Sequence, residues 1–356
     1  MSIPLSQAYA VVKYITQQKL RRNRYYPLVL MLEPLFRCNL ACAGCGKISY
    51  PDEILQQRLT TEQCFAAVDE CGAPIVSIPG GEPLLHEAID RIVAGLIARE
   101  KYIYLCTNGQ ILKQKLHLFK PSRYLTFSVH LDGLDEYHDR IVGRQGAYDT
   151  ATQAIRHALK MGFRVTTNTT LYADADVQKT RLFFDTVTSL GVESMMISPG
   201  YSFSSSSDQD NFLSRQRSVE LFSHILANSK REWKFNQSPL FLDFLMGQRQ
   251  YECTPWCMPT YNIFGWQKPC YLVDEGYASS FRQLLEETDW TRYGRASGNI
   301  KCRDCMVHSG YEGSAVIDTF GSWNALIRSG QILLFGLHGN LQTTKKSEIR
   351  YEGKAG

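Results

Sequence analysis

Three cysteines, Cys38, Cys42 and Cys45, lie within eight residues, directly after a β-rich run at residues 28–33. Three thiolates from one tight loop can bind three irons of a cuboidal 4Fe-4S cluster and leave the fourth iron without a protein ligand. An open iron can bind a substrate or a cofactor. A zinc site usually has four protein ligands, and a redox Cys-x-x-Cys pair does not require Cys38. The spacing therefore favours an iron-sulfur cluster with one open iron.

A second group of five cysteines lies downstream, at Cys253, Cys257, Cys270, Cys302 and Cys305. Cys302 and Cys305 have the spacing of a metal-binding knuckle. Four of the five thiols, Cys253, Cys270, Cys302 and Cys305, could close a second metal site. An auxiliary iron-sulfur cluster, a zinc clip and plain reduced thiols are all compatible with this pattern.

The elements that must position these cysteines alternate between short β-rich runs and segments with helical spacing of apolar residues. The predicted strands are residues 28–33, 74–78, 102–106, 124–130, 163–170 and 193–198. The predicted helices between them are residues 60–70, 86–99, 148–161 and 175–190. This alternation predicts an α/β fold with a parallel sheet. A cysteine loop stands where a doubly wound sheet would carry a Gly-rich phosphate loop, so we expect a partial (β/α)6 TIM-like barrel with a cysteine-containing C-terminal extension.

The composition limits the classes of partner and compartment. The chain has 356 residues and a formal charge of +4, with no long basic block, so we expect no nucleic-acid partner. Eleven cysteines in a large chain without a secretory signal indicate a reducing compartment, and we expect a cytoplasmic protein. The longest apolar runs are far shorter than the roughly 20 residues that span a bilayer.

The domain organisation predicted from the pattern has four parts. Residues 1–25 form an N-terminal amphipathic helix, 26–201 the partial barrel, 202–330 the C-terminal extension and 331–356 a tail. The first part has apolar residues near helical spacing and a basic end. Such a helix either lies on anionic lipid, which would place the protein at the inner membrane surface, or covers the bottom of the barrel.

The cysteine loop resembles the signature of the radical S-adenosylmethionine (radical SAM) superfamily, Cys-x3-Cys-x2-Cys after the first strand. The resemblance implies a 4Fe-4S cluster held by Cys38, Cys42 and Cys45, with S-adenosylmethionine on the open iron. Reductive cleavage would then give a 5'-deoxyadenosyl radical. Many members carry an aromatic residue just before the third cysteine to pack on adenine, whereas this chain has Gly44 there, so another residue must supply that packing.

Other motifs match the superfamily in the same order along the chain. Gly80, Gly81 and Glu82 resemble the stretch that binds the methionyl amino group; the glycines let the backbone approach and Glu82 offers an anion to the ammonium. Further cofactor contacts implied by the resemblance are ribose hydrogen bonds from Ser128 and Asp132, a contact from Asn168, and adenine contacts from the backbone at residues 197–200. Ser128 and Asp132 also fit a plain strand-to-loop turn, and Asn168 also fits a structural role in its strand.

Across residues 26–312 the sequence resembles the adenosylhopane synthase family, which acts in hopanoid lipid biosynthesis. Matching segments include residues 104–108, 166–170, 239–245 and 264–272. The resemblance implies an adenosyltransferase that adds the 5'-deoxyadenosyl radical to the terminal alkene of diploptene, a polycyclic hydrocarbon. It also implies an external one-electron donor of the flavodoxin or ferredoxin type, and a membrane-dissolved substrate would favour peripheral membrane contact.

Cys106 ends the third predicted strand, at the face where barrel active sites form. A thiol there could donate a hydrogen atom to the substrate radical or steer its quenching, or it could simply be a small buried apolar residue. Ser309 stands where the resembling family has a cysteine, which argues against carrying over that family's second site. A radical SAM peptide-modifying oxidoreductase that uses the downstream cysteines for an auxiliary cluster is the alternative function.

Overall fold

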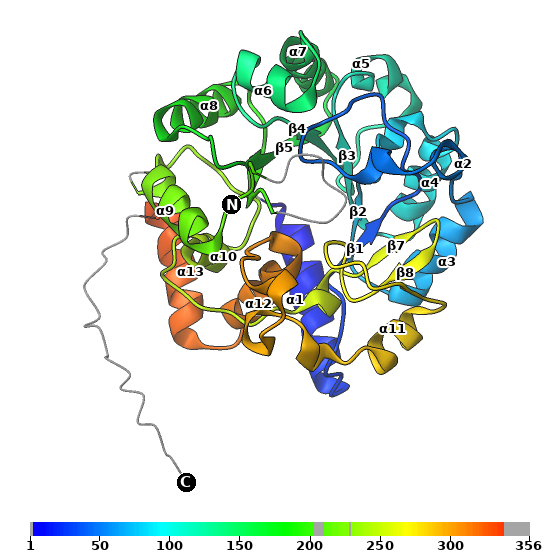
Figure 1. Cartoon of the computed structure of the whole chain (residues 1–356), viewed down its shortest axis with the longest axis vertical. Coiled ribbons are helices and arrows are strands. Elements are labelled where there is room, and N and C mark those ends of the chain that lie inside the picture. Colours follow the sequence, from blue (N-terminus) through cyan, green and yellow to red (C-terminus); the bar gives the residue numbers. More distant parts are fainter. Residues whose placement is uncertain (1–2, 202–209, 228, 338–356) are drawn as a thin grey trace.

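The computed structural model describes residues 3–201, 210–227 and 229–337, and its strands form one sheet in the order β6-β5-β4-β3-β2-β1-β7-β8-β9. The six strands from β1 to β6 pair in parallel and curve around a central space (Figure 1). They are β1 (Val29–Leu32), β2 (Ile75–Ile78), β3 (Tyr102–Thr107), β4 (Leu125–His130), β5 (Arg164–Leu171) and β6 (Ser194–Pro199). The predicted partial barrel is confirmed, and each predicted strand boundary is right to within one residue.

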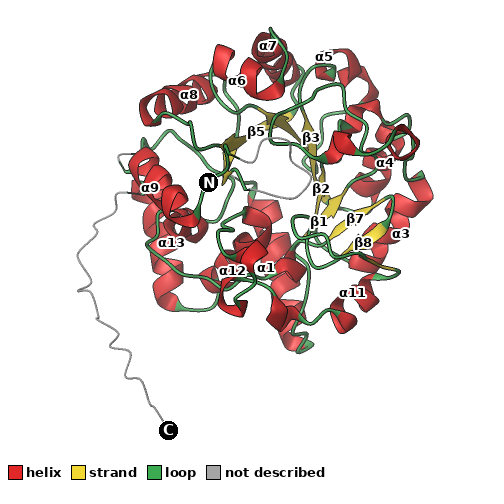
Figure 2. Cartoon of the chain, in the orientation of Figure 1, coloured by secondary structure: helices red, strands yellow, loops and turns green. Residues whose placement is uncertain are grey.

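Helices cover the outside of this curved sheet (Figure 2). They are α2 (Asp52–Leu55), α3 (Thr61–Cys71), α4 (Ile89–Ala98), α5 (Leu112–Lys115), α6 (Asp135–Val142), α7 (Ala147–Lys160) and α8 (Val177–Ser189). The α3 helix shows why these boundaries are sharp: Thr60 and Gln63 form a capping box at its start, and Gly72 ends it in the left-handed conformation.

The alternation of side chains along the strands separates the core from the central space. Outward residues such as Leu30, Val76 and Leu105 are completely buried against the helices. Their neighbours on the opposite face, including Ser77 and Cys106, line the central space instead. Ser77, Cys106, Ser128 and Asn168 therefore lie on the inner face of the barrel.

The sheet extends beyond the six predicted strands. β7 (Thr260–Asn262) pairs in parallel with β1, and β8 (Gly265–Gln267) and β9 (Tyr277–Ala278) follow as antiparallel neighbours. These strands are two or three residues long, too short to show a period in the sequence. They attach the C-terminal extension to the barrel edge.

Helices of the C-terminal part and the N-terminal helix occupy the side of the molecule opposite the curved sheet (Figure 1). They are α1 (Leu5–Leu20), α10 (Pro239–Leu245), α12 (His308–Thr319) and α13 (Trp323–Phe335), whereas α9 (Arg215–Leu226) packs beside α8 and α11 (Phe281–Glu287) beside α3 and β8. At the free edge of β6, the side-chain amide of Gln237 both donates to and accepts from the backbone of Ile197. The ring of Tyr311 on α12 stacks on the ring of Phe244 on α10, with 4.7 Å between the ring centroids.

Two of the predicted domain boundaries lie in the C-terminal part of the chain. The tail predicted to begin at residue 331 begins inside α13, which continues to Phe335 because Ile332 is buried and Arg328 makes a two-point ion pair with Asp243 of α10 at 2.9 Å for each contact. The boundary predicted at residues 202–209 and the tail from 338 onward lie outside the described residues. Within the described ranges, no helix is both long and apolar enough to cross a membrane.

The α1 helix packs against the barrel through one face only. Gln7 donates a hydrogen bond from Nε2 to the Tyr104 hydroxyl of β3 at 2.9 Å, and Ile15 packs with Tyr26 and Leu28. The predicted N-terminal helix is therefore present and partly fills the role of a barrel cover. Its residues Leu5 and Tyr9 remain exposed.

Candidate functional site

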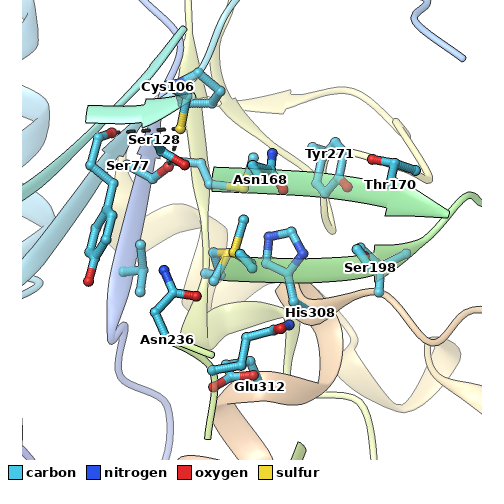
Figure 3. A pocket seen from close by; sticks show the side chains of 18 of the residues that line it. Ser77, Cys106, Ser128, Asn168, Thr170, Ser198, Asn236, Tyr271, His308 and Glu312 are labelled. Carbon is cyan, nitrogen blue, oxygen red and sulfur yellow. Dashed lines mark hydrogen bonds between the residues drawn. The ribbon is translucent and has the colours of Figure 1, made fainter. Parts of the chain in front are cut away.

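A cavity of about 640 Å³ occupies the inside of the barrel. It reaches from the cysteine loop, past the inner face of β1 to β6, to α1 on one side and to α12 and α13 on another. Figure 3 shows its wall, where Ser77, Cys106, Ser128 and Asn168 project inward from neighbouring strands. The lining contains eight of the ten predicted site residues, namely Cys38, Cys42, Cys45, Gly80, Gly81, Cys106, Ser128 and Asn168.

The cysteine loop lies over the carboxyl ends of the strands and is held there by two neighbours. Asn108, just beyond β3, donates from Nδ2 to Asn39 Oδ1 at 2.7 Å and contacts Cys38 Sγ at 3.6 Å. The backbone N–H of Ala43 donates to the carbonyl of Ile141 in α6 at 2.9 Å. These contacts hold the loop against the end of β3 and against α6.

The three thiols of the loop fit an iron-sulfur cluster. Burial raises the pKa of Cys38 to about 11 and also raises that of Cys42, and negative charge on Cys45 adds to both shifts, so the three sulfurs are close neighbours. Yet no group of three or more His, Cys, Asp or Glu side chains in the described ranges forms a site for a metal ion. Three thiols on one loop are the number of ligands that a cuboidal cluster with one open iron requires.

The two glycines after β2 are required by close packing against the cysteine loop. A Cβ on Gly81 would lie 2.2 Å from the carbonyl oxygens of Phe36 and Arg37, and Gly80 has a φ of +82°. The Gly81 N–H donates to the carbonyl of Leu35 at 3.0 Å. The glycine pair therefore packs the loop against the barrel and also lines the cavity. A sequence pattern alone cannot tell whether such glycines are needed for this packing or for direct contact with a ligand.

Glu82 has a different environment from the one its motif suggested. Its side chain is fully buried and is absent from the lining of the cavity. Its carboxylate accepts hydrogen bonds from the Thr107 hydroxyl at 2.9 Å, from the Asn108 N–H at 2.8 Å and from the Leu84 N–H at 3.1 Å. Burial raises its pKa to about 7. These contacts favour a positioning role, in which Glu82 ties the glycine pair to the end of β3.

Of the two residues predicted to bond ribose, only Ser128 faces the cavity. Asp132 is buried; it accepts from the Thr170 N–H at 2.7 Å, and its other oxygen lies 2.7 Å from His130 Nε2. Burial opposes a charge on His130, but the Asp132 carboxylate raises its pKa overall. Asp132 thus holds β4 to β5 and orients His130, which lines the cavity itself.

Tyr172 is a residue that the sequence analysis missed. It follows β5, and its hydroxyl would lie 2.2 Å from a Cβ placed on Gly44. It also lines the cavity beside Gly200, where a Cβ would meet its ring at 2.7 Å. Because Gly44 has no side chain, the ring of Tyr172, which follows β5, can lie beside it.

Cys106 projects into the cavity between Ser77 of β2 and Ser128 of β4 (Figure 3). Its sulfur lies 3.5 Å from Ser77 Oγ, and burial raises its pKa to about 11. A thiol with that pKa keeps its S–H hydrogen at neutral pH. The predicted site residue thus points into the cavity as a protonated thiol.

Two titratable residues on α12, His308 and Glu312, also face the cavity and were not predicted (Figure 3). They are one helical turn apart on the same face. Burial lowers the pKa of His308 to about 4 and raises that of Glu312 to about 8, so both are neutral at pH 7. His308 Nδ1 and Glu312 Oε2 have no hydrogen-bond partner among the described residues. No sequence motif pointed to these two residues, because α12 lies far from the barrel motifs along the chain.

The comparisons with known proteins agree with this geometry. The family model of the radical SAM superfamily matches residues 32–183, which run from the end of β1 to α8 and include the cysteine loop. This match assigns residues 32–183 of the chain to the radical SAM superfamily. A second family model, described as a domain of unknown function (DUF3463), matches residues 195–329. Members of the superfamily use a 4Fe-4S cluster and S-adenosylmethionine, and the residues of the cavity fit these cofactors.

Sequence relatives match mainly over the barrel. Fe-coproporphyrin III synthase of Methanosarcina barkeri is 30% identical over 142 residues, which are 37% of this chain and 35% of that protein. The GTP 3',8-cyclase of Clostridium perfringens strain SM101 is 30% identical over 39% of this chain and 45% of that one. Mycofactocin maturase MftC of Mycolicibacterium smegmatis is 28% identical over 41% and 38%. The chain thus spans less than half the length of these curated relatives.

Solved structures match over more of the chain. Streptococcus suis SuiB bound to its precursor peptide SuiA has a TM-score of 0.59 and 14% identity, over 87% of this chain and 76% of that one. The protein anSMEcpe with bound AdoMet has a TM-score of 0.57 and 16% identity, over 85% and 99%. At these identities the likeness shows the fold, which supports the partial barrel and its extension.

Proposed function

We propose that this protein cleaves S-adenosylmethionine reductively and uses the resulting 5'-deoxyadenosyl radical on a second substrate held in the same cavity. The observation that carries the proposal is the placement of Cys38, Cys42 and Cys45 together at one end of a cavity of about 640 Å³. When bound, the cluster supplies the electron that breaks the carbon–sulfur bond of the cofactor. The remaining work of the protein is to bind, orient and exclude water.

The cavity wall offers separate contacts for the parts of S-adenosylmethionine. Ser128 and Asn168 provide polar atoms for the ribose and the methionyl group, and the backbone at Gly80 and Gly81 lies next to the cysteine loop. Tyr172 takes the place of the missing aromatic residue before the third cysteine and packs on adenine. Glu82 and Asp132 keep these contacts in position from behind the wall.

For the second substrate we propose a bulky apolar alkene, of which diploptene is the type, and adenosyl transfer as the reaction. The cavity is lined mostly by apolar and small side chains beyond the cofactor contacts, among them Met31, Ile75, Val316 and Leu333. Carbon 5' of the radical forms a bond to the terminal alkene carbon, the π bond breaks, and the unpaired electron moves to the substituted carbon.

Cys106 then ends the reaction in this proposal. Its S–H transfers a hydrogen atom to the substrate radical, which leaves a sulfur radical on Cys106. One electron from an external donor of the flavodoxin or ferredoxin type, together with one proton, restores the thiol. The raised pKa of Cys106 supports this role because a hydrogen-atom donor must hold its hydrogen.

The rim of the cavity supports delivery of an apolar substrate from a membrane surface. Leu333 of α13 and Ala8 of α1 line the cavity, while Trp323 of α13 is 80% exposed and Leu5 of α1 is 69% exposed. Exposed apolar side chains of this size beside an apolar cavity suit peripheral contact with a lipid bilayer. The proposal therefore includes a cytoplasmic location at the inner membrane surface and no nucleic-acid partner.

A radical SAM oxidoreductase that modifies a peptide is the second candidate. The fold likeness to SuiB, solved with its precursor peptide, and the match to mycofactocin maturase favour this class. The relatives and solved structures described above include no lipid adenosyltransferase, so the comparisons favour this candidate and the apolar cavity favours the first. In the second candidate the radical abstracts a hydrogen atom and free 5'-deoxyadenosine is released.

One anaerobic assay separates the two candidates. Reduced protein is incubated with S-adenosylmethionine and diploptene, and the products are analysed by mass spectrometry. Adenosylated hydrocarbon supports the first candidate, whereas free 5'-deoxyadenosine with unchanged diploptene contradicts it. In the first case, Cys106→Ala should still form the carbon–carbon bond but change the yield or stereochemistry of the quenched product, with Cys71→Ala, a buried cysteine of α3, as the matched control. An unchanged product from Cys106→Ala would remove its assigned role.

A further inference from the structure

Several residues that line the cavity have a buried polar atom without a hydrogen-bond partner. Within the described ranges, four such atoms are Ser198 Oγ, Asn236 Oδ1, His308 Nδ1 and Glu312 Oε2. Native folds keep few atoms of this kind, because a buried polar atom without a partner has lost its bond to water and gained nothing in return. Four of them around one cavity therefore indicate a partner that is not part of the chain.

The segment 236–238 joins the parts of the wall from which these four side chains come. The side-chain amide of Gln237 bonds to the carbonyl and to the N–H of Ile197 in β6, at 2.8 and 2.9 Å. The N–H of the next residue, Ser238, donates to Glu312 Oε1 on α12. One short stretch of chain therefore bridges β6 and α12, and it engages only one of the two carboxyl oxygens of Glu312.

The four side chains form one region of the wall, which we call the polar patch. Ser198 and Asn236 directly neighbour, along the chain, the two residues that form the amide bonds. His308 lies one helical turn before Glu312 on the same face of α12. Figure 3 shows all four below Cys106 in the view. The polar patch therefore lies on a part of the wall that is separate from the thiol.

The polar patch carries no charge at neutral pH. Burial raises the pKa of Glu312 to about 8 and lowers that of His308 to about 4. The one lysine or arginine among the described lining residues is Lys47, which pairs with Glu33 at 2.8 Å. A phosphate, carboxylate or ammonium group would therefore find no opposite charge at the polar patch, and burying such a group unpaired is costly.

The donors and acceptors of the polar patch select among uncharged groups. Asn236 Oδ1 can only accept a hydrogen bond, so the ligand group must donate one. The Ser198 hydroxyl and the neutral carboxyl group of Glu312 can both donate, so the ligand group must also accept. A carbonyl oxygen cannot donate and an alkene does neither. A hydroxyl group is the simplest group that does both.

The wall beside the polar patch is apolar. Val316, one turn beyond Glu312 on α12, lines the cavity together with Leu333 of α13. A hydroxyl group bound at the patch would therefore belong to a molecule with a largely apolar body.

We propose that the polar patch binds a hydroxyl group of the second substrate, which is a bulky apolar alkene that carries this group away from its reacting carbon. The inference rests on the proposed function in taking the cavity to hold that substrate. Diploptene has no hydroxyl group, so the inference narrows the substrate to an alcohol of similar bulk. The reaction at the alkene is unchanged by it.

The test compares two probes that differ only in the hydroxyl group. Lupeol is a pentacyclic alcohol whose terminal alkene lies at the opposite end of its ring system, and its deoxy form is the matching hydrocarbon. Each is added in the same detergent micelles to the reconstituted holoenzyme with S-adenosylmethionine. Dissociation constants are obtained from the rise in the thermal unfolding midpoint with ligand concentration, which requires no turnover. The wild type should bind lupeol about tenfold more tightly than its deoxy form.

Variants of the polar patch should change this ratio. Asn236→Ala should bring the ratio of the two dissociation constants to about one, because it removes the acceptor. The variant should not unfold at a lower temperature without ligand, since Asn236 Oδ1 has no partner to lose in the described ranges. Glu312→Gln keeps an acceptor for the Ser238 N–H and a donor for the ligand, so it should retain the preference for lupeol. Gln57→Ala, at an exposed amide outside the cavity lining, is the control and should keep the wild-type ratio.

Two results would overturn the inference: equal affinity of the wild type for the two probes, and a preference for lupeol that persists in Asn236→Ala. Product analysis by mass spectrometry in the same samples separates this failure from that of the proposed function. A preference for lupeol without any adenosylated product would contradict the proposed reaction and support the hydroxyl site. Adenosylation of both probes with equal affinity would contradict the hydroxyl site alone.

Discussion

The two cysteine groups of this protein are built in opposite ways. Cys38, Cys42 and Cys45 come from one loop after β1 and face an open cavity. The downstream four come from three segments and are enclosed by backbone at Gly294 and Gly310. A loop with three thiols beside a cavity can leave one iron open to a cofactor, whereas thiols enclosed by packed backbone have no such access. The difference teaches that the placement of cysteines beside a cavity, more than their number, indicates a site for chemistry.

The largest effect should follow from breaking the first group. Cys42→Ala removes one of only three ligands, so we expect loss of about four irons and loss of S-adenosylmethionine cleavage to background. The measurement is product formation by mass spectrometry beside the iron content. Cys64→Ala, in the buried face of α3, is the control and should leave both unchanged. Full cleavage by Cys42→Ala would contradict the assignment.

Tyr172 sharpens the account of the first group. We expect Tyr172→Ala to raise the KM for S-adenosylmethionine about tenfold, since stacking of a base on an aromatic side chain is worth about 1–3 kcal/mol. Tyr172→Phe keeps the ring and should restore the KM. A KM in Tyr172→Phe as high as in Tyr172→Ala would assign the effect to a hydrogen bond of the hydroxyl group instead.

The smallest predicted effect concerns Glu312, which lies on α12 and faces the cavity. Burial raises its pKa in the folded protein to about 8 from an ordinary value of 4.5. The folded state therefore binds more protons than the unfolded state between these values, and stability falls as the pH rises from about 4.5 to 8. Thermal unfolding should show that Glu312→Gln loses part of this pH dependence, by a few degrees. Parallel curves for the two proteins would contradict the pKa shift.

Sequence analysis predicted the barrel well because its strands and helices carry strong periodic patterns. The six strands and the cysteine loop follow from local signals, since Cys38 to Cys45 lie on one loop. Glu82 and Asp132 show the limit: both belong to recognisable motifs, yet their carboxylates bond to Asn108 and Thr170 of neighbouring strands and not to the cavity. A motif identifies the segment at a site but not the direction of each side chain.

The parts that could not be predicted depend on contacts between distant segments. Tyr172 lies beside Gly44 although more than a hundred residues separate the two in the sequence. His308 and Glu312 reach the cavity from the C-terminal extension. The short strands β7 to β9 give no period, although they join that extension to the barrel. The convergence of the downstream cysteines has the same origin, because only the packed fold brings their three segments together.

The most direct test of the central claim is an electron paramagnetic resonance measurement on the reduced protein with its cluster loaded. The cluster should be the one held by Cys38, Cys42 and Cys45, and Cys42→Ala, which lacks one of these ligands, is the control. Addition of S-adenosylmethionine should then shift the spectrum, because the cofactor binds the open iron. A spectrum of a loaded cluster that S-adenosylmethionine leaves unchanged would contradict the assignment of this loop as the site of cofactor cleavage.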